Sequence, residues 1–277
     1  MTAARTVQRG LLYLVLTVGA VACLVPIFWL VRSSLMTLVE VFKYPPLLWA
    51  TRTRWENYAI ALTTSPFLLY FRNTLIIVIP TVLATLVTSS MSAYGLARFR
   101  FPLRNFWFAM VLGAIILPPA VVLIPQFIMW TKVHLVNTFY PLIVPFWFGG
   151  GAFNVFLLRQ FFLTIPKDFD DAARMDGANY FRIYWQILLP FIQPALIAVG
   201  LFQFFFQWND FFGPLIYLND PKTYTLALGL THFIGSYSTQ WNFLMAATVI
   251  VVLPPIVVFF VGQRYFVEGV TLTGIKM

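Results

Sequence analysis

Residues 171–190, DAARMDGANYFRIYWQILLP, hold charged side chains in the interior of a chain that is otherwise almost without charge. Of the 277 residues, 60% are apolar and only 10% are charged, and the mean hydropathy is +0.83. A water-soluble domain carries about 25% charged residues, so this chain has too few charges to cover a soluble surface. The composition therefore predicts an integral membrane protein.

Apolar stretches of membrane-crossing length recur along the chain. A helix needs roughly 20 apolar residues to cross about 30 Å of hydrocarbon at 1.5 Å per residue. Lipid offers no partner to unpaired backbone groups, and the sequence lacks the apolar–polar alternation of barrel strands, so each span is expected to be helical. We predict an all-α, polytopic membrane protein with one domain over residues 1–277 and six transmembrane helices, at about 11–31, 73–97, 105–127, 139–161, 191–211 and 244–261.

The positions of Lys and Arg predict the orientation of the chain. With the N-terminus inside, the inner segments hold eleven of the 18 basic residues and the outer segments hold seven. Arg98, Arg100 and Arg104 share one very short loop, which favours the cytoplasmic side. Both termini and residues 162–190 are therefore predicted to be cytoplasmic. The net charge of +9 fits inner-face cations beside anionic lipid and needs no nucleic acid.

Motifs of catalysis are nearly absent from the sequence. It contains no G-x-x-x-x-G-K-[ST] phosphate loop, no H-E-x-x-H and no G-x-S-x-G. His134 and His232 lie in different predicted outer loops without further ligands at metal-binding spacing, and Cys23 is the only cysteine. We expect a non-catalytic chain that holds no metal or cofactor of its own and works by moving.

The charged segment is predicted to form two short helices. Asp168 occupies the place of an N-cap, and Asp171 has the spacing of its reciprocal partner in a capping box. Gly177 permits the left-handed residue that ends a helix, and a second helix is expected from about Asn179 toward Pro190.

This segment resembles the cytoplasmic signature loop of binding-protein-dependent ABC importer permeases. In that family the loop reads Glu-Ala-Ala, three residues to a Gly, and about nine more to a hydrophobic-x-Leu-Pro ending. SAYGLARFRFP, ILPPAVVLIPQF, LVNTFYPLIVP, WNDFFGPLIYLNDPKTYTLALGL and QRYFVEGVTLTGIKM extend the resemblance over most of the chain. These motifs are similar to the carbohydrate branch of the family, and to the smaller permease partner of maltose-type importers in particular.

The resemblance implies a type I ABC importer permease fold in a bacterial or archaeal plasma membrane. It implies alternating access driven by a cytoplasmic ABC ATPase dimer, which binds the ATP and Mg, together with a second homologous permease and an extracytoplasmic sugar-binding protein. Asp171 stands where the family has Glu, one methylene longer, and a helix-capping role is its alternative. The residues expected to couple to the ATPase are Asp171, Ala172, Ala173, Met175, Asp176, Gly177, Ala178 and Phe181.

Polar residues of the fifth span predict a path for cargo. Gln203, Gln207 and Asp210 are spaced i, i+4, i+7 and share one helix face. Polar groups at membrane depth usually face the bundle interior or a water-filled path, where sugar hydroxyls can bind them; the alternative is that the glutamines join neighbouring helices. The expected path residues are Gln203, Gln207, Trp208, Asn209, Asp210 and Asn154.

Two stretches favour close helix packing instead. Thr74, Thr81, Thr85, Thr88 and Ser92 line one face of the second span, where hydroxyls bond back to helix carbonyls and let helices approach. The stretch FGGGAFN, residues 148–154, predicts close packing or a break in the backbone.

Other classes of protein stay open at this point. A secondary transporter driven by an ion gradient would need charged residues near the midplane and broken helices in matched halves, whereas Asp210 is the only acid near a span. A passive membrane subunit would leave the capped inner helices unexplained. For an importer, the expected cargo is a sugar or oligosaccharide, with a polyol or glycerophosphodiester as the alternative.

Overall fold

The computed structural model describes residues 2–235 and 239–274, so Met1 and the last residues of the predicted cytoplasmic tail, 275–277, lie outside the described residues. Over the described part, the regular structure is helical, with a single isolated bridge between Ile234 and Thr239. The chain forms two compact units. The first comprises Met1–Leu68 and Gly229–Leu253, and the second comprises Leu69–Leu228 and Pro254–Met277.

The predicted spans correspond to long apolar helices. Among the described residues, four are long and apolar enough to cross a membrane: Gln8–Ser34, Phe67–Arg98, Tyr140–Thr164 and Trp241–Arg264. Two bent pairs add up to two more, Arg104–Ile116 with Ala120–Lys132 at 99° and Tyr180–Phe191 with Gln193–Trp208 at 80°. The all-α polytopic prediction is confirmed. The third predicted span is broken, whereas the fifth contains the continuous helix Gln193–Trp208 and is bent only at its start, where Tyr180–Phe191 leads into it.

Proline explains the break in the third predicted span. The first half ends at Ile116, after which Leu117 and Pro118 are extended and a new helix starts at Pro119. A proline disfavours helical backbone at the residue before it and lacks the N–H that would continue the helix. Two successive prolines therefore stop one helix and start the next.

The first unit contains α1 (Thr2–Ser34), α2 (Leu38–Val41), α3 (Glu56–Thr64), η4 (Leu230–Phe233) and the first part of α15 (Trp241–Gly274). Asn57 ties α3 to the end of α1, because its buried amide donates to the carbonyls of Ser34 at 2.8 Å and Met36 at 2.9 Å. At α2, Thr37 and Glu40 form a capping box. The backbone amide of Thr37 donates to the Glu40 carboxylate at 2.9 Å and lowers the pKa of Glu40 from 4.5 to about 2.

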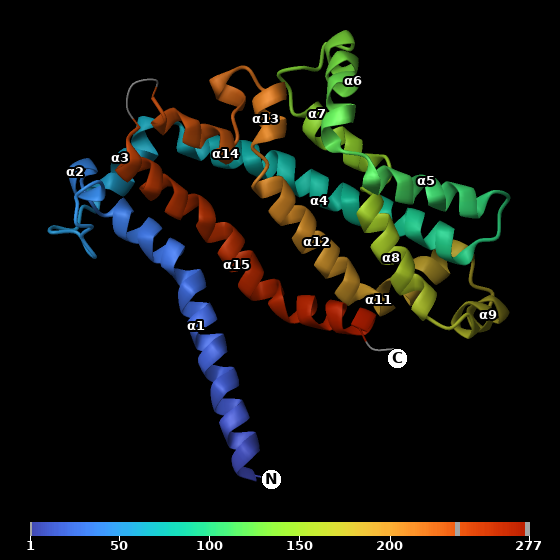
Figure 1. Cartoon of the computed structure of the whole chain (residues 1–277). Helices are drawn as coiled ribbons and strands as arrows, with labels where there is room; N and C mark the ends of the chain where they lie inside the picture. Colours follow the sequence, from blue (N-terminus) through green and yellow to red (C-terminus); the bar gives the residue numbers. More distant parts are fainter. Residues whose placement is uncertain (1, 236–238, 275–277) are drawn as a thin grey trace. The chain divides into compact units, whose positions relative to one another are not determined.

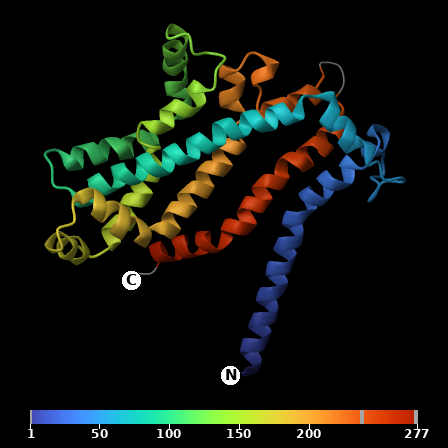
Figure 2. The same cartoon turned by 180° about the vertical axis from the view of Figure 1, so that it is seen from behind.

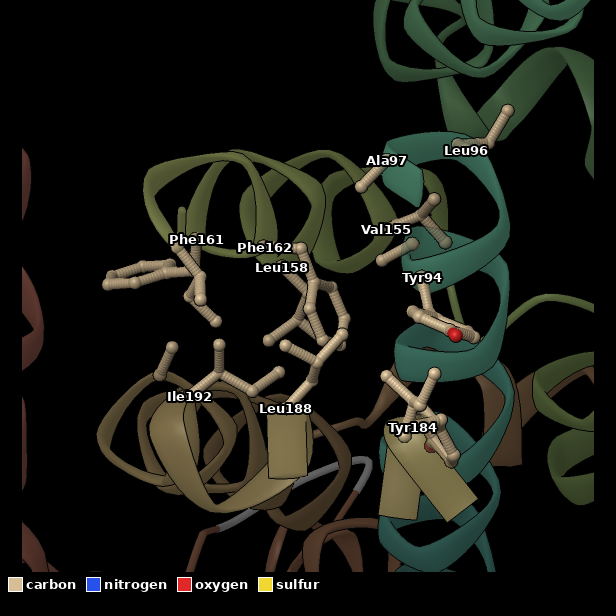
Figure 3. Close-up of a cluster of buried hydrophobic side chains, with 14 of the residues drawn as sticks. Tyr94, Leu96, Ala97, Val155, Leu158, Phe161, Phe162, Tyr184, Leu188 and Ile192 are labelled. Atoms are coloured by element: carbon tan, nitrogen blue, oxygen red, sulfur yellow. The ribbon is translucent and has the colours of Figure 1, made fainter. Parts of the chain in front are cut away.

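The second unit is built on α4, which runs beside α5 and crosses α8 in both views (Figures 1 and 2). Its core lies where α4, α8 and the segment leading into α12 meet: Tyr94, Leu158, Phe162, Leu188 and Ile192 point toward one another there (Figure 3). Its helices are the second part of α15, from Pro254 on, and α4 (Phe67–Arg98), α5 (Arg104–Ile116), α6 (Pro119–Lys132), α7 (Tyr140–Ile143), η1 (Val144–Trp147), α8 (Ala152–Thr164), α9 (Asp168–Met175), α10 (Tyr180–Arg182), η2 (Ile183–Leu188), α11 (Leu189–Phe191), α12 (Gln193–Trp208), α13 (Phe212–Tyr217), η3 (Pro221–Thr223) and α14 (Leu226–Gly229).

Small residues let α4 approach the chain just before α8. Gly150 has φ +65°, and a Cβ placed on it would lie 2.7 Å from the Thr85 carbonyl oxygen and 2.8 Å from Ser89. Gly149 and Gly151 also have positive φ, so the helix is interrupted between η1 and α8. FGGGAFN is thus both a close approach and a backbone break. The prediction for this face is confirmed at three of its five residues, because the hydroxyls of Thr74, Thr81 and Thr88 donate to the carbonyls four residues earlier. The buried Thr85 hydroxyl has no hydrogen-bond partner among the described residues, and for Ser92 the bond stays a prediction.

Candidate functional site

The predicted coupling segment forms α9 and a tight turn. After α9, Asp176 is the last residue near helical backbone and Gly177 follows with φ +79°. The Gly177 N–H donates to the Arg174 carbonyl at 3.0 Å, and the Ala178 N–H donates to the Ala173 carbonyl at 2.9 Å. This pair of bonds is a Schellman motif, which favours glycine at the left-handed position. Asn179 then caps α10, accepting from the Arg182 N–H at 2.8 Å. The predicted helix stop and restart are both confirmed.

The capping box predicted at the start of α9 is wrong. Lys167 is the N-cap, its backbone is already helical, and it makes no side-chain capping bond. Asp168 is the first helical residue, and the Asp171 carboxylate instead lies 3.3 Å from the Arg174 guanidinium. Asp168, Asp170 and Asp171 still occupy the first turn, where the helix dipole favours negative charge.

A buried ion pair anchors α9 to the end of α4. Arg98 Nε lies 3.5 Å from Asp170 Oδ2, and the two side chains are only 3% and 5% exposed. A second nitrogen of Arg98 donates to the Ile165 carbonyl at 2.9 Å, just before α9. Removal of either member would leave the other as an uncompensated buried charge, so the pair ties α9 to α4 as the helices are packed here.

Tyrosines extend this anchoring to the residues after α9. The Tyr94 hydroxyl donates to the Tyr180 carbonyl at 3.1 Å, and the hydroxyls of Ser90 and Tyr184 share a hydrogen bond of 2.7 Å. Tyr94 and Ser90 both belong to α4. The whole segment from α9 to η2 is therefore tied to one long helix by contacts to Ser90, Tyr94 and Arg98.

The opposite face of α9 is left open. Met175 is 89% exposed and Phe181, in α10, is 66% exposed, although both are large apolar side chains. Asp171, Ala172, Asp176 and Gly177 are exposed as well, whereas Ala173 is buried and Ala178 is packed against the core. The eight predicted coupling residues thus divide into an anchored face and an open face that carries two apolar side chains.

A charged pocket lies between α9 and the turn after α4, which occupy the same end of the second unit in both views (Figures 1 and 2). Its volume is about 790 Å³, and its lining includes Arg98, Arg100, Lys167, Asp171 and Arg174. Cations outnumber carboxylates there, because Asp170 and Asp171 are the only acids of its lining. The lining of this pocket therefore carries a net positive charge.

The predicted path residues fall into two groups. Gln203 and Gln207 are each 5% exposed within the chain, and Gln203 Nε2 and Gln207 Oε1 have no hydrogen-bond partner among the described residues. Trp208 is buried and stacks on Phe204, with ring centroids 5.4 Å apart. These three side chains lie together on α12, two of them with unsatisfied polar atoms.

The other path candidates make local backbone contacts. Asn209 donates back to the Phe205 carbonyl at 2.8 Å, and the Asp210 carboxylate accepts from the Gly213 N–H at 3.0 Å beside the start of α13. Asn154 donates to the Gly150 carbonyl at 2.8 Å and steadies the break before α8. Such bonds organise the backbone, and a role in the path stays a prediction for all three.

Sequence reasoning missed the Arg98–Asp170 pair and its tyrosines. From the sequence, Arg98 was interpreted only as a cation of the inner membrane face, and Asp170 only as an acidic residue in the first turn of a helix. One signal was present in the sequence: Asp170 and Ala173 are spaced i, i+3, which places them on one face of a helix. That face of α9 is the buried one. The partner of Asp170 lies 72 residues earlier in the chain (170 − 98), and no local pattern identifies it.

The chain thus combines membrane-length helices with a short anchored helix that has an open apolar face. Residues 85–272 match the model of the binding-protein-dependent transport system inner membrane component family, and the chain belongs to this family.

Curated relatives of the chain are permease proteins of sugar and glycerol-phosphate transport systems. The chain is 33% identical to the arabinooligosaccharides transport system permease protein AraQ of Bacillus subtilis, covering 91% of this chain and 90% of that protein. It is also 33% identical to the sn-glycerol-3-phosphate transport system permease protein UgpE of Rhizobium meliloti, covering 97% and 98%. The fold matches a chain of a bacterial ABC transporter involved in the import of the acidic polysaccharide alginate, with a TM-score of 0.83 at 23% identity over 94% of this chain and 97% of that chain.

Proposed function

We propose that this permease subunit imports a sugar or oligosaccharide across a bacterial or archaeal plasma membrane. It forms half of the translocation path with a second homologous permease. A cytoplasmic ABC ATPase dimer binds the ATP and Mg and docks on the open face of α9 and α10, and an extracytoplasmic sugar-binding protein delivers the cargo. Both termini lie in the cytoplasm in this arrangement.

The observation that carries the proposal is the two-sided design of α9. One face is tied to α4 by Arg98, and the other exposes Met175 and the Gly177 turn. Exposed apolar side chains beside charged ones are what a protein–protein contact requires. A force applied to the open face passes into α4 through the buried pair.

Helix α4 also supplies a link to the other side of the membrane. It has 32 residues, which at 1.5 Å per residue is roughly 48 Å and exceeds the hydrocarbon thickness. At its other end, the Asn73 amide donates to the carbonyls of Lys222 and Tyr224, each at 2.9 Å, and the Thr74 hydroxyl accepts from the Leu226 N–H at 2.9 Å.

We infer that α4 connects the ATPase contact with the outer segment 222–226. Docking of the ATPase at one end and docking of the sugar-binding protein at the other then both bias the position of the same helix. Two ligands that bias one two-state element are coupled by that element. In this arrangement the partner ATPase binds the ATP, and α4 carries its effect to the outer segment.

The cargo class rests on the relatives. AraQ and UgpE carry the names of arabinooligosaccharide and sn-glycerol-3-phosphate transport, which supports a carbohydrate first and a polyol or glycerophosphodiester as the second candidate. The buried amides of Gln203 and Gln207 suit hydroxyl-rich cargo once helices separate, because their free polar atoms can exchange hydrogen bonds with it. Uptake of labelled arabinooligosaccharide and of labelled glycerol-3-phosphate by the complete importer separates the two candidates.

The coupling role is tested at Gly177. A Cβ on this glycine meets no atom within 4 Å, and Asp and Asn tolerate left-handed backbone better than other residues, so Gly177→Asp and Gly177→Asn are expected to insert normally. Their bulk should keep the turn from seating in the ATPase, so that ATP is hydrolysed without import. Normal cargo uptake by either variant, at wild-type expression, refutes the coupling role.

A further inference from the structure

A second basic pocket opens on the turn between α4 and α5. It encloses about 550 Å³ and is lined by Arg100, Arg104 and Lys167, together with Asn105 and three apolar side chains. The lining contains no carboxylate, and none of the three cations forms an ion pair with a described residue. Arg104 makes one long bond of 3.3 Å to the Phe99 carbonyl. The pocket therefore concentrates three positive charges with no carboxylate in its own lining and no ion pair to a described residue.

Apolar grooves lead from this pocket along α5. Phe106 lines the basic pocket and also begins a groove of about 430 Å³, which continues over Ala109, Met110, Gly113 and Leu117. These residues are spaced i, i+3, i+4, i+7, i+11 and form one stripe of the helix. An apolar groove therefore starts at the cations and follows the helix axis.

A second groove begins at the same pocket. Phe101 lines the basic pocket and a groove of about 630 Å³, which runs between α5 and the neighbouring helices past Trp107, Val111, Leu96 and Val155. Helix α5 has 13 residues, or roughly 20 Å at 1.5 Å per residue, comparable with the ~15 Å of hydrocarbon in one leaflet. Two grooves of leaflet length thus meet at one cluster of cations.

We propose that this site binds one anionic phospholipid, with the phosphate-bearing headgroup among Arg100, Arg104 and Lys167 and an acyl chain in each groove beside α5. A cation cluster at the boundary of the hydrocarbon attracts anionic headgroups. A basic pocket joined to two apolar grooves matches one headgroup with two acyl chains, whereas a helix of a partner protein would not need that combination. The proposal requires that the chain spans a membrane, which its family membership establishes, and it is independent of the cargo.

Position gives the lipid a role in coupling. Lys167 is the N-cap residue of α9, while Arg100 and Arg104 belong to the turn after α4 and the start of α5. A headgroup shared by these three residues bridges the turn and the coupling helix. Bound lipid then holds α9 in place from outside the core, in addition to the buried Arg98–Asp170 pair.

Lipid retention by the complete importer tests the site. The complex is purified in detergent, titrated with phosphatidylglycerol or phosphatidylcholine, and the bound lipid is counted by native mass spectrometry. The wild type is expected to prefer phosphatidylglycerol, and Arg100→Gln/Arg104→Gln/Lys167→Gln to lose on the order of tenfold in that preference. Lys43→Gln/Arg52→Gln/Lys132→Gln removes the same charge from exposed positions elsewhere and should keep the preference.

A groove variant tests the acyl chains. A Cβ on Gly113 meets nothing within 4 Å, so Gly113→Leu is expected to fold and to fill the groove, lowering phosphatidylglycerol retention severalfold with the cations intact. Displacement of the lipid by millimolar inorganic phosphate, with no effect of Gly113→Leu, would mean a simple anion site and overturn the proposal. Loss of the ATPase from the triple variant, with lipid retention unchanged, would show a protein contact instead and also overturn it.

Discussion

Removal of the buried carboxylate of Asp170 should release α9 from α4. In Asp170→Asn, the Arg98 guanidinium keeps the Ile165 carbonyl at 2.9 Å but loses its only negative partner among the described residues. Removal of one member of a buried pair costs about 3–5 kcal/mol. The separation of 3.5 Å is longer than a strong charge-assisted hydrogen bond of about 2.7–2.9 Å, which places the cost near the lower end, about 3 kcal/mol.

A cost of about 3 kcal/mol changes the ratio of docked to released α9 roughly a hundredfold. The assay is ATP hydrolysed per cargo molecule imported, measured with the complete importer in proteoliposomes. Asp170→Asn and Arg98→Met are each expected to hydrolyse ATP with little import. Glu56→Gln is the control, because it removes one member of an exposed ion pair. Such a pair contributes at most about 1 kcal/mol to stability, so this variant should couple ATP hydrolysis to import like the wild type.

The double variant Arg98→Met/Asp170→Leu shows whether the defect of the single variants comes from an unpaired buried charge or from the loss of these two particular side chains. Replacement of a buried pair by apolar groups of similar volume is often neutral or stabilising, so coupling should largely return. Two results would show that the pair does not transmit force. One is a double variant whose loss of coupling equals the combined losses of the two single variants, and the other is normal import by the single variants.

Three further outcomes are expected. Gly150→Ala should lower the apparent unfolding temperature in detergent clearly more than Gly149→Ala, because its Cβ meets backbone at 2.7 Å while that of Gly149 meets nothing within 4 Å; equal melting would contradict the close approach. Because the pKa of Glu40 is lowered to about 2, its capping bonds stabilise fully above about pH 4.5 and are lost as the pH falls toward 2. Hydrogen exchange at α2 should follow that window and Glu40→Gln should abolish it. Met175→Glu should reduce ATPase co-purification about tenfold, whereas Val39→Glu, at another exposed apolar side chain, should leave it unchanged; equal recovery would remove α9 from the contact.

Local chemistry explains which predictions about the coupling segment succeeded. Gly177 adopts the left-handed turn and Asn179 caps the next helix because both effects depend on neighbours within a few residues. The capping box at Asp168 failed because Lys167 is already helical, which moves the helix start by one residue and frees Asp171 to meet Arg174. Errors of one residue at helix ends are expected from local patterns alone.

Apolar runs predicted where helices lie but not how they are interrupted. Pro118 and Pro119 lie within the third predicted span, where the structure has a complete break with a new helix start. At the start of the fifth predicted span, the segment Tyr180–Phe191 meets the helix Gln193–Trp208 at a bend of 80°. Whether a proline bends or ends a helix depends on the packing that replaces the lost hydrogen bonds.

The sequence by itself determined the membrane class, the helical state of each span and the chemistry of the Gly177 turn, because hydropathy and backbone preference act over short stretches. Tertiary structure alone decided that Asp170 meets Arg98, that Gly150 meets α4, and that Arg100, Arg104 and Lys167 face one pocket. These contacts join residues distant in the chain. Their geometry follows from how whole helices pack, and no local pattern of residues contains that information.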